Sequence, residues 1–155
     1  MAKSLSTLLP KERAIPTTAA NRESGFWRTM KAGVATTNRN LTATRLESWA
    51  LPGVPDVMLC DEQGKFHFVE LKATAGRAVD LRPHQVAWLH RHAKLKASVW
   101  VLVLKVATKT KPQEVRLYPG SKASDLKLEG MAVEPLYLGS EEIDWDMILG
   151  LIAPI

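Results

Sequence analysis

The stretch from Gly53 to Lys72 reads GVPDVMLCDEQGKFHFVELK. Two short apolar runs flank an acidic, glycine-containing turn, a pattern that predicts a β-hairpin. Asp56 stands at the start of the first run, and Glu70 and Lys72 lie in the second. Because residues two apart in a strand point the same way, Glu70 and Lys72 share a face, and strand pairing brings Asp56 close to them.

A charged side chain in a buried strand is costly unless it is paired or bound to a metal ion. Two carboxylates and an ammonium that converge on one spot suit a hard divalent cation beside a proton-handling group. A structural interpretation stays open, in which Glu70 and Lys72 form a salt bridge across a half-exposed strand while Asp56 caps a turn. The hairpin therefore predicts either a metal site or a local ion pair.

Periodicity and chain breakers around the hairpin predict a mixed α/β domain with a small central sheet flanked by helices. Residues 1–20 are expected to be a loosely ordered basic segment, and residues 21–155 a single domain with a C-terminal helical extension. The predicted elements are a helix capped by Asn21 or Ser24 and stopped by Gly33, a strand over 41–49, a helix over 84–96, strands over 97–106 and 114–118, a weak helix over 121–130, and a last helix capped by Ser140.

The bulk composition is that of an ordinary soluble domain of 155 residues. A single cysteine, Cys60, excludes an intrachain disulfide and a cysteine-based zinc site. No apolar run approaches the ~20 residues that span a bilayer, and residues 1–13 lack the apolar core of a signal peptide. We expect a cytoplasmic protein without a membrane partner.

The net charge of +5 is unevenly distributed along the chain. Residues 1–46 carry eight Lys or Arg against two Glu, and residues 82–116 carry eight against one Glu. From Glu134 onward there are five acids and no Lys or Arg. Two basic blocks and an acidic tail indicate a polyanionic partner, for which nucleic acid is the first candidate.

Pro55-Asp56 followed by Glu70-Leu71-Lys72 resembles the signature of the PD-(D/E)XK nucleases. The preceding glycine, the hairpin, and the segment Leu81-Arg82-Pro83-His84-Gln85 with an aromatic three residues later are similar to the phage-type VRR-NUC and Holliday-junction-resolvase-like branch. The resemblance covers roughly residues 21–104. It implies a restriction-endonuclease-like core and Mg²⁺-dependent hydrolysis of phosphodiester bonds, with Mn²⁺ able to substitute and branched DNA as the substrate.

The resemblance also implies roles for individual residues. Asp56 and Glu70 would be metal ligands, and the backbone carbonyl of Leu71 would add a third. Lys72 would orient or activate the attacking water and stabilise charge on the phosphate. Gln85 matches the helix glutamine of the family and would support that water or Lys72.

The family often supplies a further carboxylate from its first helix, a role that Glu23 matches. Glu47 in the next predicted strand is a rival for the same role, and the sequence does not decide between them. Each also has a structural interpretation. Glu23 would sit in the first turn of a helix, where a carboxylate suits the dipole, and Glu47 would face solvent from an edge strand.

Two other functions are open besides a structure-selective endonuclease. A non-catalytic nucleic-acid-binding domain of nuclease fold is disfavoured because Asp56, Glu70 and Lys72 are all intact. A sequence-specific restriction-type nuclease is disfavoured because the chain shows no separate recognition domain.

A homodimer is also predicted, because resolving a junction takes two cuts and one chain carries one set of site residues. Its apolar surface would come from Phe26, Trp27, Trp49, Trp88 and residues 149–152.

Overall fold

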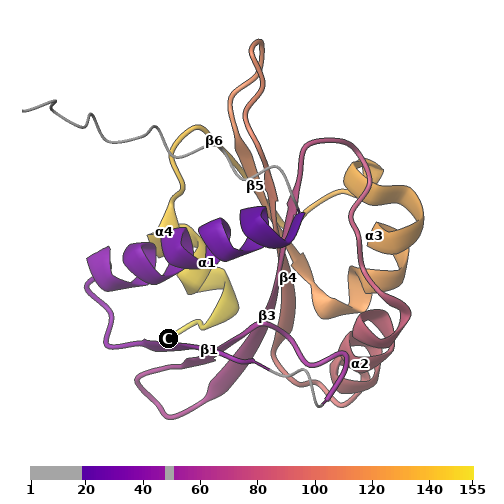
Figure 1. Cartoon of the computed structure of the whole chain (residues 1–155). Helices are drawn as coiled ribbons and strands as arrows, with labels where there is room; N and C mark the ends of the chain where they lie inside the picture. The colour runs from indigo at the N-terminus through magenta and orange to yellow at the C-terminus, as the bar shows by residue number, and fades with distance from the viewer. Residues whose placement is uncertain (1–18, 48–50) are drawn as a thin grey trace, which may run out of the picture.

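The structure of the protein, a computed structural model, describes residues 19–47 and 51–155. Within these residues the strands form a single six-stranded mixed sheet whose spatial order follows the chain (Figure 1). Every neighbouring pair is antiparallel except the parallel pair β3–β4. The strands are β1 (Thr42–Arg45), β2 (Val57–Cys60), β3 (Phe66–Thr74), β4 (Val99–Lys105), β5 (Glu114–Pro119) and β6 (Tyr137–Ser140).

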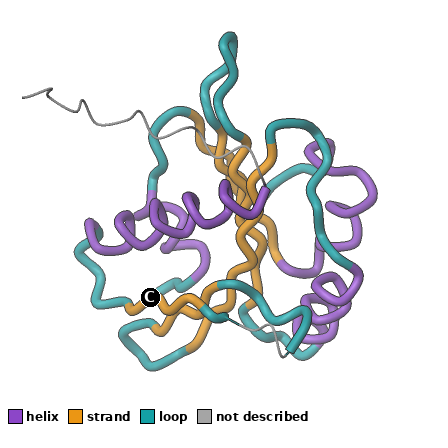
Figure 2. The backbone as a smooth tube through the Cα atoms, in the orientation of Figure 1, coloured by secondary structure: helices purple, strands orange, loops and turns teal. Residues whose placement is uncertain are grey.

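Helices cover both faces of the sheet, which Figure 2 shows as strands enclosed between two groups of helices. Helices α1 (Ala19–Thr36) and α4 (Trp145–Ile152) pack on one face, where Phe26, Met30 and Trp145 join a buried apolar cluster. Helices α2 (Pro83–Lys94) and α3 (Ala123–Glu129) cover the other face with a second cluster. Two short 3₁₀ turns, Gly120–Lys122 and Gly130–Ala132, flank α3. The expected α/β class with a mixed, helix-flanked sheet is therefore confirmed.

The predicted hairpin is present as β2 and β3, with Val57 paired to Val69. The side chain of Asp61 holds its turn, because Oδ1 accepts from the backbone N–H groups of Gln63 and Lys65 and Oδ2 lies 2.8 Å from His67 Nε2. Hydrogen bonding to His67 lowers the pKa of Asp61 to about 2. The acidic turn thus fixes the register that places Asp56 next to β3.

The first helix departs from the prediction at both ends. It already includes Ala19, so Asn21 and Ser24 are not its caps, and Glu23 does not lie in its first turn. Gly33 does not stop it, and α1 continues to Thr36. The reason is packing, because a Cβ atom on Gly33 would overlap the indole of Trp145. This glycine allows α1 to cross closely over α4 instead of ending the helix.

The C-terminal region also differs from the prediction. Ser140 is the last residue of β6, a strand that the sequence did not predict, and it does not cap the last helix. Asp144 caps α4 instead, where its Oδ1 accepts from Met147 N at 3.0 Å.

Two other predicted ranges are only partly described. The strand predicted over 41–49 is confined to Thr42–Arg45, and residues 48–50 lie outside the described residues. Most of the predicted loose segment 1–20 also lies outside them, although Ala19 and Ala20 belong to α1. In the part of the chain that is described, no helix is long and apolar enough to cross a membrane.

Candidate active site

The site is built on an open edge of β3. Strand β2 pairs with β3 only as far as Val57 and Val69, and the chain turns away at Asp56. Beyond that point no described strand lies on this side of β3. The carboxylate of Asp56 continues the pairing, because its Oδ2 accepts from Leu71 N at 3.0 Å. The N–H and C=O of one strand residue point to the same edge, so the carbonyl of Leu71 also points to this open edge.

Glu70 points to the face that α2 covers. Gln85 Nε2 donates to Glu70 Oε1 at 2.6 Å, and Gln85 Oε1 accepts from Arg82 N at 2.9 Å. The start of α2 therefore holds Gln85 from both sides. Glu70 itself is only 1% exposed, and its second oxygen, Oε2, is buried without a hydrogen-bond partner among the described residues.

Lys72 connects Glu70 to helix α1 through ion pairs with Glu70 and Glu23. Its Nζ lies 3.4 Å from Glu70 Oε1 and 3.8 Å from Glu23 Oε1, and the residue is 6% exposed. The structure thus brings together Asp56, Glu70, Lys72, Gln85 and Glu23, which come from the hairpin and the two helices on either side of the sheet. Glu47, the rival of Glu23, is exposed and is not brought into this group.

Burial raises the pKa values of the three carboxyl groups of the site, Glu70, Asp56 and Glu23. It raises the pKa of Glu70 to about 8, with the nearby Asp56 charge adding to the shift and Lys72 opposing it. Burial also raises the pKa of Asp56, against the hydrogen bond from Leu71 N, and the pKa of Glu23, against the charge of Lys72. Clustered carboxylates with raised pKa values are typical of sites that are completed by a cation or that handle protons.

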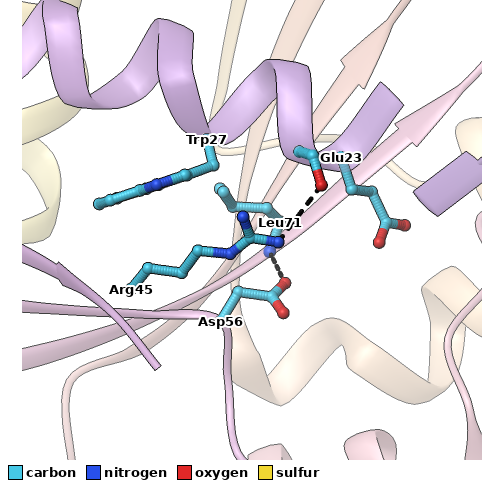
Figure 3. A pocket seen from close by; sticks show the side chains of 6 residues that line it. Glu23, Trp27, Arg45, Asp56 and Leu71 are labelled. Atoms are coloured by element: carbon cyan, nitrogen blue, oxygen red, sulfur yellow. Dashed lines mark hydrogen bonds between the residues drawn. The ribbon is translucent and has the colours of Figure 1, made fainter. Parts of the chain in front are cut away.

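A small pocket opens beside these carboxylates (Figure 3). Glu23 and Trp27 reach it from α1, Arg45 from β1 and Asp56 from the start of β2. The guanidinium of Arg45 donates to Ser24 Oγ at 3.3 Å. A second hollow, which Asp56 also lines, is bordered by residues that include Arg82 and His84. The residues that line these hollows are Glu23, Ser24, Trp27, Arg45, Asp56 and Leu71 for the first, and Leu46, Pro52, Gly53, Val54, Asp56, Arg82, His84 and Gln85 for the second.

Sequence reasoning did not single out Arg45 as a site residue. It lies opposite Val57 in the β1–β2 ladder, one position from Asp56, and the next backbone amide, Leu46 N, donates to the carbonyl of Asp56 at 2.7 Å. Only the pairing of β1 with β2 brings this cation to the carboxylates, and no local motif marks it.

The donor set fits a hard divalent cation. The described residues contain no cluster of three or more His, Cys, Asp or Glu side chains suited to a metal. Mg²⁺, however, is commonly held by one or two carboxylates together with water and substrate phosphate oxygens. Asp56, Glu70 and the Leu71 carbonyl offer only oxygen, and the buried Glu70 Oε2 lacks the partner that a cation would provide.

The alternative interpretation, in which the charged residues of the hairpin form only a local ion pair and a turn cap, agrees with the structure only in part. The Glu70–Lys72 ion pair is present, but it lies on a buried strand and not a half-exposed one. Asp56 binds the neighbouring strand at Leu71 N instead of capping its own turn. The buried, unpaired oxygen of Glu70 costs free energy that an ion pair formed for stability would avoid. No protein-family model, curated protein or solved structure matches this chain.

Proposed function

We propose that the protein is a Mg²⁺-dependent DNA endonuclease that hydrolyses phosphodiester bonds and prefers branched DNA such as Holliday junctions. Its core would be of the restriction-endonuclease type, with Asp56, Glu70 and Lys72 as the active site. The resemblance to PD-(D/E)XK nucleases suggests the reaction, and the arrangement of these side chains at an open sheet edge supports it.

The unpaired oxygen of Glu70 is the observation that carries the proposal. A buried carboxylate oxygen without a partner is destabilising. When Asp56 and Glu70 are both ionised, Asp56 adds negative charge beside this oxygen, and either a cation or a proton shared by the two carboxyl groups relieves it. Gln85 fixes the other oxygen, so Oε2 is free for a ligand that arrives from outside the chain. A divalent cation held by Asp56 and Glu70 would satisfy both carboxylates.

Asp56, Glu70 and the carbonyl of Leu71 would hold the ion, and Mn²⁺ would substitute for Mg²⁺ because both prefer oxygen ligands. When bound, the ion supplies positive charge against the phosphodiester and lowers the pKa of water. Glu23 adds negative charge at the far side of Lys72, 3.8 Å from its Nζ, and keeps that ammonium at the site.

Lys72 acts on the reacting groups. In hydrolysis a water oxygen attacks phosphorus and loses a proton to solvent, the bond from phosphorus to the leaving sugar oxygen breaks, and that oxygen takes up a proton from solvent. The ammonium of Lys72 donates hydrogen bonds that orient the water and stabilise the extra negative charge on the phosphate oxygens. Arg45 lines the pocket beside Asp56 and would bind a phosphate oxygen of the same strand.

Cleavage of a labelled four-way junction tests this function against a linear duplex of the same sequence. We expect Mg²⁺-dependent nicking of the junction, with much slower cutting of the duplex. Binding without cleavage of either substrate in Mg²⁺ or Mn²⁺ would instead indicate a non-catalytic DNA-binding domain. Cleavage of the duplex at one fixed sequence would indicate a restriction-type nuclease.

A further inference from the structure

A basic groove lies between two loops beyond the end of β3. One wall is the β3–α2 loop with Arg77, and the other is the β4–β5 hairpin, which supplies Lys105 and Lys111. We infer that this groove, formed by residues 75–77 and 105–114, binds the phosphate backbone of the DNA arm that leaves the active site. The inference rests on the proposed function for the identity of the polyanion.

Both walls are shaped by their own hydrogen bonds. In the first, Thr74 Oγ1 accepts from Gly76 N at 3.2 Å and donates to Ala78 O at 2.9 Å. In the second, Thr108 N donates to Lys111 O at 2.9 Å and Lys111 N donates to Thr108 Oγ1 at 3.1 Å. The β4–β5 hairpin projects clear of the helices in Figure 1. A groove held between two braced loops needs little ordering when a ligand binds.

The charges of the groove favour an anion. No described carboxylate is ion-paired with Arg77, Lys105 or Lys111. The single carboxylate in the lining, that of Glu114, forms an ion pair with Arg116, whose Nη2 lies 3.0 Å from Glu114 Oε2.

The groove is close enough to the active site for one duplex to contact both. Lys105 pairs with Thr74, two residues beyond Lys72 on β3. At ~3.3 Å per residue, the tip of the hairpin near Thr108 reaches up to about 17 Å beyond Lys72. This span corresponds to roughly five phosphates along one strand of a duplex, at ~3.4 Å each.

Fluorescence anisotropy of the full chain with a labelled four-way junction tests the inference, with Ca²⁺ in place of Mg²⁺ and over a series of salt concentrations. The groove variant is Arg77→Ala/Lys111→Ala, which removes one exposed cation from each wall. The matched control is Lys65→Ala/Lys122→Ala, which removes two exposed cations elsewhere. Circular dichroism melting checks that both variants are folded.

We expect the groove variant to bind about tenfold more weakly and the slope of log K against log salt to become shallower by about 2, since each lost phosphate contact removes ~0.9. For the control variant, both the affinity and the salt slope should stay within about twofold of the wild-type values. A folded groove variant that binds like the wild type overturns the inference, whether or not the protein cleaves DNA. The expected loss of affinity in a protein without Mg²⁺-dependent cleavage supports the groove and rejects the nuclease.

Discussion

Glu70 is buried, lies near another carboxylate and has an unpaired oxygen. All three features make it destabilise the metal-free fold. Its pKa is raised from the ordinary value of 4.5 to about 8. Glu70 therefore ionises at a lower pH in the unfolded chain than in the folded protein, so its contribution to the stability of the metal-free protein falls as pH rises from about 4.5 to about 8 and then levels.

We predict that Glu70→Gln stabilises the metal-free protein, because glutamine does not ionise. The gain should be small near pH 4.5 and should grow with pH to at most roughly 5 kcal/mol, at ~1.4 kcal/mol per pKa unit. Urea denaturation in EDTA at several pH values measures it, with the exposed Glu47→Gln as the control. Adding Mg²⁺ should stabilise the wild type and not the variant. A wild type that is insensitive to both pH and Mg²⁺ would contradict the prediction.

The choice between Glu23 and Glu47 gives a second prediction. Glu23 lies 3.8 Å from Lys72 Nζ and lines the pocket with Asp56, whereas Glu47 is exposed. Glu23→Gln should slow single-turnover cleavage by about ten- to a hundredfold, the range for a residue that supports a metal site without ligating the ion. Glu47→Gln should cleave at the wild-type rate. The opposite order of the two rates would assign the supporting role to Glu47.

Strand alternation and the hairpin pattern were sufficient to predict that Asp56, Glu70 and Lys72 lie together, because both are local features. Gln85 was added only by the resemblance to the nuclease family. The sequence was not sufficient to choose Glu23, since that choice depends on how α1 crosses the sheet. Arg45 was missed for the same reason, because its place depends on the pairing of β1 with β2.

At the scale of elements, the two glycines of α1 have opposite roles. A Cβ on Gly33 would overlap the indole of Trp145, whereas a Cβ on Gly25 would meet no atom within 4 Å. We predict that Gly33→Ala destabilises the fold by about 1–3 kcal/mol through overpacking. Gly25→Ala should instead stabilise it by up to ~1 kcal/mol through helix propensity. Urea denaturation of both variants measures the difference, and equal effects would show that the α1–α4 contact is not tight.

The long apolar run of β4 and the hairpin of β2 and β3 were predictable because each carries a strong local pattern. Strand β6 was not, since its sequence, Tyr137–Ser140, is short and half-exposed and is a strand only through pairing with β5. The error at Ser140 follows from this, because a serine before two glutamates has the local pattern of a helix start.

For the whole molecule, the prediction of a homodimer stands on the need for two cuts and no longer on apolar surface. Phe26, Leu149 and Ile152 are buried in one subunit, Trp27 and Trp88 are half-buried, and Trp49 lies outside the described residues. We expect light scattering at micromolar concentration to give a dimer, at least on junction DNA. A monomer under both conditions would contradict this and favour a nickase or flap-type activity.

The central claim is that Asp56, Glu70 and Lys72 perform metal-dependent chemistry and do not chiefly bind DNA. It is tested most directly by measuring junction binding and single-turnover cleavage in Mg²⁺ for the wild type and for the alanine variant of each residue. We predict that all three variants bind the junction within a few fold of the wild type, since affinity comes from phosphate contacts elsewhere, and that none cleaves. Full cleavage by Glu70→Ala in Mg²⁺ would contradict the claim.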